Sequence, residues 1–218
     1  MEYPIKFDGQ EVFGIYIHEP GPLVSNFAIA TTCFIVALRF WNVKGYYARS
    51  WLLFVLFIGM GATGGMVVHG FPQALSPKQF YFTWAVKNSF VPVANFFAAR
   101  AVLSPRIGSV SKLHIILGVK AAIVSILLFL TYQFTPAVVD LVLTYFLVLG
   151  TTWKKGVVPG ARYLRRAFLI ALGSGFLYLF PFNWFSGWFT NKDAVHVFVI
   201  VSIFYIASAI KRVRLSNF

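Results

Sequence analysis

Seven apolar stretches, each long enough for one membrane crossing, dominate this sequence. A spanning helix needs about 20 predominantly apolar residues, and such stretches lie at 23–42, 50–71, 79–103, 112–133, 136–153, 163–182 and 193–211. Charged residues make up only 11% of the 218-residue chain, against about 25% in soluble domains. So few charges cannot cover a water-facing surface. We therefore predict an all-α, polytopic membrane protein, folded as a bundle of seven transmembrane helices.

The chain divides into three parts around this bundle. Residues 1–22 form an extracytoplasmic N-terminal segment, 23–211 the transmembrane domain, and 212–218 a cytoplasmic tail. The first twenty residues include acidic side chains and lack a long apolar core, so they are not a signal peptide. Asp8-Gly9 lies between two alternating apolar stretches, a pattern that predicts a short β-hairpin, which could cap the bundle on its own side.

Basic residues predict the orientation, because cytoplasmic loops are enriched in lysine and arginine. The loops after the first, third and fifth stretches and the C-terminal tail hold Lys44, Arg49, Arg106, Lys154, Lys155, Arg162, Lys211, Arg212 and Arg214, whereas the opposite side holds Lys6, Lys78 and Lys192. The N-terminus should be outside and the C-terminus inside, in the plasma (inner) membrane if the protein is bacterial. Trp41, Trp51 and Trp153 should lie at the inner boundary, and Trp184 and Trp188 at the outer one. Since topology accounts for the net charge of +13, we expect membrane lipids as partners and no nucleic acid.

Histidines and carboxylates from distant segments share the outer layer of this bundle. His69 ends the second stretch, Asp193 and His196 open the seventh on one side of its helix, and Glu19 precedes the first. Nitrogen and oxygen ligands of this kind suit zinc. We predict a polar site with His69, His196 and Asp193 as metal ligands and with Asp193 or Glu19 in a catalytic role. The alternative is that both histidines are interfacial residues hydrogen-bonded to loops.

Small residues and a lysine suggest how the interior is lined. Gly61, Gly65 and His69 recur at four-residue spacing, which allows close helix packing and predicts that His69 faces the bundle. Packing alone would explain the glycines but not the histidine. Lys87 and Asn88, about two turns inside the third stretch, are predicted to bind a ligand or cofactor.

The depth of Lys87 predicts an ion pair. Its amine should point into the bundle near a carboxylate such as Asp140 or Asp193, and the alternative is that it snorkels to the outer surface. For Lys120, two turns from the cytoplasmic side of the fourth stretch, snorkelling is the expected arrangement.

Two short motifs resemble the CREST superfamily of seven-helix membrane hydrolases, which includes alkaline ceramidases and adiponectin receptors. Gly65-Met66-Val67-Val68-His69 resembles its helix 2 motif, and Asn191 to His196 resembles the start of its helix 7. Glycine replaces the family's serine at residue 65, Ile200 replaces its second helix 7 histidine, and no aspartate lies between residues 70 and 100.

A second resemblance involves Glu19-Pro20 through Ser25-Asn26, together with the Gly-Gly-x-x-x-His and Asn-x-Asp-x-x-His patterns. These are similar to an uncharacterised bacterial seven-helix membrane family. That similarity implies the fold and the layout of the helices, and it implies no activity.

Two functions follow as hypotheses. The first is a metal-dependent membrane hydrolase of a lipid amide or ester, in which a metal-bound water attacks the carbonyl. The second is a non-catalytic seven-helix binding, sensing or assembly subunit. Transport through the bundle interior past Lys87 and Asn95 ranks last, because the sequence shows no series of ionisable residues spaced across the full depth of the membrane. The lost second histidine and aspartate weigh against the enzyme, whereas the outer polar layer favours a binding site.

Overall fold

The chain folds into long helices with two short hairpins, as described by a computed structural model for residues 9–12, 14–104, 110–153, 158–179, 183–184 and 188–216. The α-helices are α1 (Pro20–Arg39), α2 (Tyr46–Gly70), α3 (Pro77–Leu103), α4 (Val110–Thr131), α5 (Thr135–Trp153), α6 (Ala161–Ser174) and α7 (Asn191–Ser216). The fold also contains two short 3-10 helices, η1 (Pro72–Ala74) and η2 (Gly175–Leu179). Its four short strands are β1 (Gln10–Val12), β2 (Ile15–Ile17), β3 (Asn183–Trp184) and β4 (Phe189–Thr190). The prediction of an all-α fold is confirmed.

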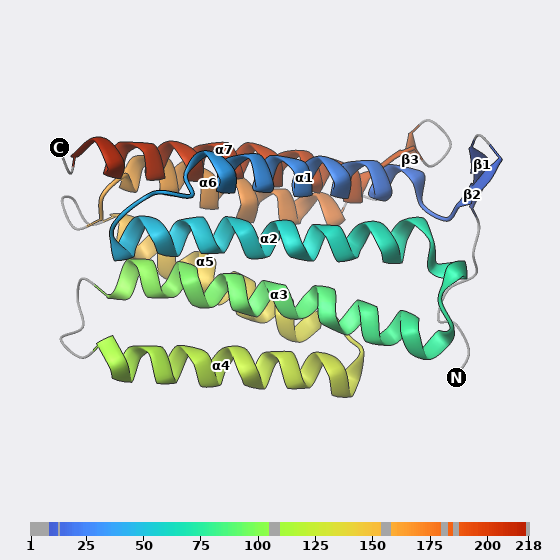
Figure 1. Cartoon of the computed structure of the whole chain (residues 1–218), viewed down its shortest axis with the longest axis horizontal. Helices are drawn as coiled ribbons and strands as arrows, with labels where there is room; N and C mark the ends of the chain where they lie inside the picture. Colours follow the sequence, from blue (N-terminus) through green and yellow to red (C-terminus); the bar gives the residue numbers. More distant parts are fainter. Residues whose placement is uncertain are drawn as a thin grey trace.

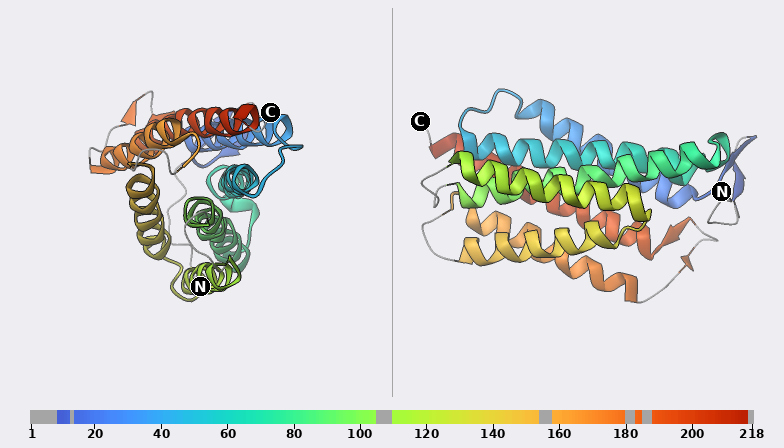
Figure 2. Two further views of the ribbon diagram at one scale, coloured as in Figure 1. Left: turned by 90° about the vertical axis from the view of Figure 1, so that its left-hand side faces the viewer. Right: turned by 90° about the horizontal axis from the view of Figure 1, so that it is seen from below.

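The helices lie side by side and reverse direction at each connection (Figure 1). Seen along the bundle axis, α1, α2, α3 and α4 follow one another around the bundle, and α5 and α6 lead back to α7, which lies beside α1 (Figure 2). The β1–β2 hairpin and the α2–α3 connection lie at one end of the bundle, and the C-terminus lies at the other (Figure 1). We call these the hairpin end and the C-terminal end.

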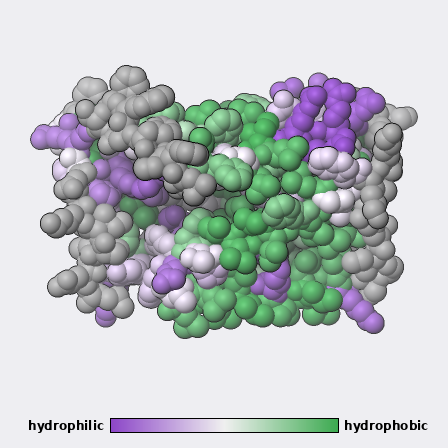
Figure 3. Space-filling view, turned by 180° about the vertical axis from the view of Figure 1, so that it is seen from behind, coloured by the Kyte–Doolittle hydropathy of each residue, from purple (hydrophilic) through white to green (hydrophobic). Residues whose placement is uncertain are grey.

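Five helices are long and apolar enough to cross a membrane: α1, α2, Lys112–Thr131 of α4, α5 and Asn191–Val213 of α7. Hydrophobic side chains cover the middle of the face seen in Figure 3, and polar ones gather mainly toward its two ends. Many large apolar side chains are exposed on this bundle, among them Leu38 at 75% and Leu130 at 73%. An apolar surface of this extent is stable against lipid and not against water.

The remaining two helices differ from the predicted stretches for identifiable reasons. Lys87, Asn88 and Asn95 reduce the hydropathy of α3, although its 27 residues exceed the length of a crossing. The predicted helix over 163–182 was too long, because α6 ends at Ser174 and gives way to the 3-10 helix η2. The 14 residues of α6 span only about 21 Å.

Local signals fix where the helices begin. Ser76 caps α3 in a capping box with Gln79, and Pro77 occupies the first turn, where it lacks only an N–H that would be unpaired.

The N-terminal hairpin exists, with β1 antiparallel to β2 in a register that pairs Gln10 with Ile17. Its turn contains Gly14, at a φ of +77°, so the predicted turn at Asp8-Gly9 was misplaced. Asp8 itself lies outside the described residues.

The aromatic core corrects one interfacial assignment. Trp51 is completely buried and makes edge contacts with Phe54 and Phe168, which joins α2 to α6. Its predicted role in the interfacial aromatic belt was therefore wrong, because the face of α2 that bears it meets another helix. Trp41 and Trp153 are 60% and 61% exposed, as expected, whereas the side chain of Trp184 lies outside the described part of the chain.

Candidate functional site

The segment before α1 pairs with the end of α2 at the hairpin end of the bundle. The amide of His18 donates to the carbonyl of Gly70 at 3.1 Å, and the amide of Glu19 donates to the carbonyl of His69 at 2.9 Å. These bonds bring the carboxylate of Glu19 against the His69 ring. Glu19 Oε2 lies 2.5 Å from His69 Nδ1, and Glu19 Oε1 lies 2.6 Å from the amine of Lys192 at the start of α7.

A second histidine is held in a similar way on α7. The hydroxyl of Ser25 on α1 lies 2.7 Å from His196 Nδ1 and 2.7 Å from Asp193 Oδ1. The other oxygen of Asp193 accepts hydrogen bonds from the amide and the hydroxyl of Thr190, both at 2.8 Å. Asp193, which is only 2% exposed, thereby satisfies donors at the N-terminus of α7. It also holds the hydroxyl of Ser25 in place.

These contacts determine which nitrogen of each imidazole carries the proton. An ionised carboxylate can only accept hydrogen bonds. Glu19 therefore accepts from Nδ1–H of His69. The single hydroxyl proton of Ser25 goes to Asp193, so His196 must donate its Nδ1–H to Ser25. In both neutral rings Nε2 then keeps its lone pair and remains an acceptor. Carboxylates behind histidines orient metal ligands and general bases in this manner.

The charge on Glu19 is strongly favoured. Burial alone would raise its pKa, but the hydrogen bonds and electrostatic attraction from His69 and Lys192 outweigh burial and lower the pKa from 4.5 to about 2. Glu19 precedes the first spanning helix. It therefore remains a carboxylate at any physiological pH and holds the proton of His69 on Nδ1.

Close packing around this site explains the glycine in the helix 2 motif. A Cβ on Gly65 would lie 2.5 Å from Oδ1 of Asn26 on α1. Asn26 is buried, and its amide donates to the carbonyl of Pro22 at 2.7 Å. The serine expected from the superfamily pattern does not fit against Asn26. Gly61 instead meets the backbone of Lys87 on α3, so the predicted glycine stripe packs against two helices.

Lys87 and Asn88 lie together, as their sequence positions predicted, but their neighbours differ from those expected. The amine of Lys87 donates to Oδ1 of Asn88 at 3.0 Å and lies 5.9 Å from the centre of the Trp84 ring. A Cβ on Gly64 would lie 2.5 Å from Cβ of Lys87, so glycine permits this approach of α3 to α2. The carboxylate that acts electrostatically on Lys87 is that of Glu19.

The predicted ion pair of Lys87 with Asp140 was wrong. Asp140 is 3% exposed and accepts from Lys120 at 2.6 Å and from Asn95 at 2.7 Å. This network joins α3, α4 and α5, and it also overturns the predicted snorkelling of Lys120. Asp193, the other predicted partner of Lys87, is engaged by Ser25 and Thr190.

The predicted metal ligands are brought together only in part. His69 and His196 are close enough to interact electrostatically. Glu19 and Asp193, however, contact the Nδ1 side of the two histidines, directly or through Ser25, and so support the rings from behind. Within residues 9–216, leaving out the undescribed gaps, no group of three or more histidine, cysteine, aspartate or glutamate side chains could hold a metal ion.

Sequence reasoning missed several residues of the site. Ser25 and Thr190 have common, uncharged side chains, and only their partners distinguish them. Lys192 was counted for its charge, although it also pairs with Glu19. At the C-terminal end, Tyr46 hydrogen-bonds and stacks on His114, and the guanidinium of Arg100 lies 3.9 Å from the Tyr46 ring centre. No sequence motif signals either grouping.

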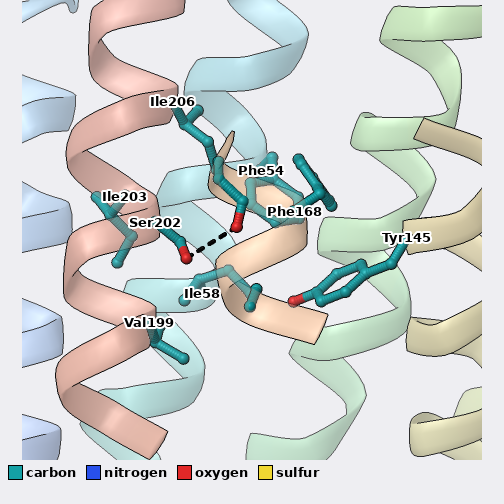
Figure 4. A pocket seen from close by; sticks show the side chains of 10 residues that line it. Phe54, Ile58, Tyr145, Phe168, Val199, Ser202, Ile203 and Ile206 are labelled. Atoms are coloured by element: carbon teal, nitrogen blue, oxygen red, sulfur yellow. Dashed lines mark hydrogen bonds between the residues drawn. The ribbon is translucent and has the colours of Figure 1, made fainter. Parts of the chain in front are cut away.

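An apolar pocket lies deeper in the bundle, between α2, α5, α6 and α7 (Figure 4). Its lining includes Ile58, Tyr145, Phe168, Val199 and Ile203. Ser202 also lines it and donates to the carbonyl of Ala167 at 3.0 Å. Val199 follows His196 by three residues, about 4.5 Å along α7. The lining contains no ionisable acid, base or histidine apart from the phenol of Tyr145, so this pocket has none of the charged groups found around His69 and His196.

Fold and site together define a helical bundle, apolar enough for a membrane, with two carboxylate-supported histidines at one end. The chain matches a family of unknown function, DUF6962, over residues 22–215, and it belongs to that family. No match was found among curated proteins or among solved structures.

Proposed function

We propose that this protein spans the membrane seven times, with its N-terminus outside, and binds a polar ligand between His69 and His196. The alternating direction of all seven helices supports the number of crossings. The distribution of charge supports the orientation. The C-terminal end of the bundle carries Arg39, Lys44, Arg49, Arg100, Lys112, Arg162, Arg165, Arg166, Lys211 and Arg212, whereas the described hairpin end carries Lys78 and Lys192 with Glu11, Glu19 and Asp193.

Single-cysteine labelling tests the orientation. In a Cys33→Ala background, cysteines are placed at Gln73 on η1 and at Lys211 near the end of α7, both exposed positions. An impermeant maleimide should label Q73C in intact cells and K211C only after the membrane is opened. Labelling of K211C in intact cells together with protection of Q73C would contradict the orientation. The loop residues Lys154 and Lys155, which the sequence also assigned to the cytoplasm, lie outside the described residues.

The observation that supports the ligand site is that the two histidine rings are hydrogen-bonded in the same way. Each ring is fixed through Nδ1, by Glu19 or by Ser25 and Asp193, and each leaves Nε2 as an acceptor. Side chains held by two layers of hydrogen bonds are preorganised for contact with another molecule. The binding function is the better supported of the two hypotheses, because it requires only these two nitrogens and the polar groups around them.

Native lipid analysis tests this binding function. Wild-type protein and the variants His69→Ala, His196→Ala and His114→Ala are purified in a mild detergent, and the lipids they retain are measured by mass spectrometry. The wild type and H114A should retain the same polar lipid, and H69A and H196A should lose it. H114A is the matched control, since His114 lies at the opposite end of the bundle on α4. Equal retention by all four proteins would contradict the proposal.

A metal-dependent lipid amide or ester hydrolase is the second candidate. The acceptor Nε2 atoms of His69 and His196 favour it, because zinc takes neutral imidazole nitrogens as ligands and would supply Lewis acid chemistry. Catalytic zinc sites usually have three protein ligands, and the described residues offer two. Elemental analysis of wild-type protein, H69A and H196A decides this point. Stoichiometric zinc that both variants lose would favour the hydrolase.

A further inference from the structure

A buried amide beside the two histidines has donors that nothing in the described chain satisfies. Asn88 is 5% exposed, and its Oδ1 accepts from the amine of Lys87 at 3.0 Å. Its Nδ2, which bears two N–H groups, is buried without a hydrogen-bond partner among the described residues. Buried polar groups are nearly always paired with protein, water or ligand. Nδ2 of Asn88 therefore requires an acceptor from outside the described part of the chain.

The positive charge of Lys87, which lies beside Asn88, favours an acceptor that is an anion. Glu19, the carboxylate that acts electrostatically on Lys87, is engaged by His69 and Lys192, and Asp193 is engaged by Ser25 and Thr190. Among the described residues, the amine of Lys87 donates to the neutral amide oxygen of Asn88 and lies over the face of Trp84. Among the described residues no carboxylate forms a direct ion pair with this lysine, which lies inside the end of an apolar bundle.

Ionisable groups from three parts of the chain act electrostatically on Lys87. His69 from α2, His196 and Lys192 from α7, and Glu19 from the segment before α1 all interact with it electrostatically. Glu19 and Lys192 form an ion pair at 2.6 Å, and each histidine adds no charge when its ring is neutral. The amine of Lys87 is then the positive charge that acts on both imidazoles without a direct carboxylate partner among the described residues. A positive charge there stabilises a bound anion and opposes a bare divalent cation.

We propose that the amine of Lys87 and Nδ2 of Asn88 form an oxyanion subsite, which holds a carboxylate or phosphate group of the ligand bound between His69 and His196. This inference rests on the proposed ligand site and names the chemistry of its occupant. The Lys87 amine supplies charge and Asn88 supplies directed N–H donors, while Nε2 of each histidine accepts from hydroxyl or amide groups of the same ligand.

Thermal unfolding of the purified protein in nanodiscs of phosphatidylcholine tests the subsite. Three probes are titrated separately: inorganic phosphate, phosphatidylglycerol built into the nanodisc, and oleate. They represent a free phosphate, a phosphate headgroup and a carboxylate carried by a lipid. The unfolding midpoint of the wild type should rise with at least one probe, because a ligand that binds the folded state stabilises it. The probe that acts identifies the source of the oxyanion.

Three substitutions and one control assign the effect to these residues. Lys87→Gln and Asn88→Leu should weaken the apparent affinity about tenfold or more, since hydrogen bonds between charged partners are among the strongest. Asn88→Asp places a carboxylate beside Lys87, so it should raise the midpoint without any probe and abolish the response. Lys78→Gln is the matched control, because Lys78 is exposed on the first turn of the same helix at the same end. It should respond like the wild type.

The results separate failure of the subsite from failure of the ligand site. A wild type that responds to none of the probes, or a K87Q protein that responds like the wild type, would overturn the subsite. N88D also remains informative if K87Q fails to fold, since an undiminished response in N88D would overturn the subsite as well. If H69A and H196A keep a response that K87Q and N88D lose, the subsite stands and the histidine site falls. If H69A and H196A lose the lipid while K87Q responds normally, the histidine site stands and the subsite falls.

Discussion

Replacing Gly65 by alanine should destabilise the bundle, although alanine is the better helix former. A Cβ at residue 65 would lie 2.5 Å from Oδ1 and 2.9 Å from Cγ of Asn26. Asn26 is held by its hydrogen bond to the carbonyl of Pro22 on its own helix. The two helices must therefore separate, or Asn26 must give up that bond. Overpacking of this kind costs about 1–3 kcal/mol.

Gly118 on α4 provides a matched control. It too lies inside a helix, and a Cβ there would meet nothing within 4 Å. Both substitutions gain the same helix propensity, up to about 1 kcal/mol, so the steric cost is the difference between them. G65A should be less stable than G118A by about 1–3 kcal/mol in reversible unfolding from detergent micelles. Asn26→Ala should relieve part of the cost in a double-mutant cycle. Equal stability of G65A and G118A would refute the close approach of α1 to α2.

Two further predictions concern the ion pairs. Because the pKa of Glu19 falls from 4.5 to about 2 on folding, its charge stabilises the folded state above pH 4.5, and this stabilisation is lost as the pH falls toward 2. The difference in unfolding free energy between the wild type and Glu19→Gln should therefore shrink over that interval, and a constant difference would contradict the reasoning. Asp140→Asn leaves Lys120 without its carboxylate and should cost about 3–5 kcal/mol. The double variant D140L/K120M should recover most of that loss, and a double variant as unstable as D140N would refute the pairing of these two residues.

Hydropathy predicted the helices well, because the length and the apolar content of each membrane-crossing segment are properties of the sequence alone. All seven predicted stretches contain a helix, and their ends moved by only a few residues except in the sixth. There Gly173 and Gly175 flank the end of α6, where the chain tightens into η2. An apolar scale does not distinguish an α-helix from a 3-10 helix.

The rotation of each helix about its axis could not be predicted equally well. In water the polar face of a helix marks its outside, but in lipid both the outer and the inner face are apolar. Trp51 was therefore assigned to the boundary although it is completely buried. Lys120 was assigned to the surface although it pairs with Asp140. Depth was predictable for both residues, whereas the neighbouring helix was not.

In the candidate site, too, the depth of the residues could be predicted but their contacts could not. Common depth brought His69, His196, Glu19 and Asp193 into one layer, and the structure places hydrogen bonds on all four. Which atoms meet depends on Ser25, which lies between Asp193 and His196 and carries no charge. The predicted roles of the carboxylates changed for this reason. They support the Nδ1 side of the histidine rings, Glu19 directly and Asp193 through Ser25, instead of joining the histidines as equal ligands.

The tautomers of His69 and His196 test the central claim most directly. The chain has only four histidines, so solid-state nitrogen NMR of ¹⁵N-histidine-labelled protein in lipid bilayers can be assigned with H69A and H196A. Both rings should be neutral at pH 7, with the proton on Nδ1 and a bare Nε2, and the His69 signal should change in Glu19→Gln. A neutral ring with its proton on Nε2 would mean that Glu19 or Ser25 does not hold Nδ1–H, and a doubly protonated ring would leave no acceptor at Nε2. Either result would contradict the proposed ligand site.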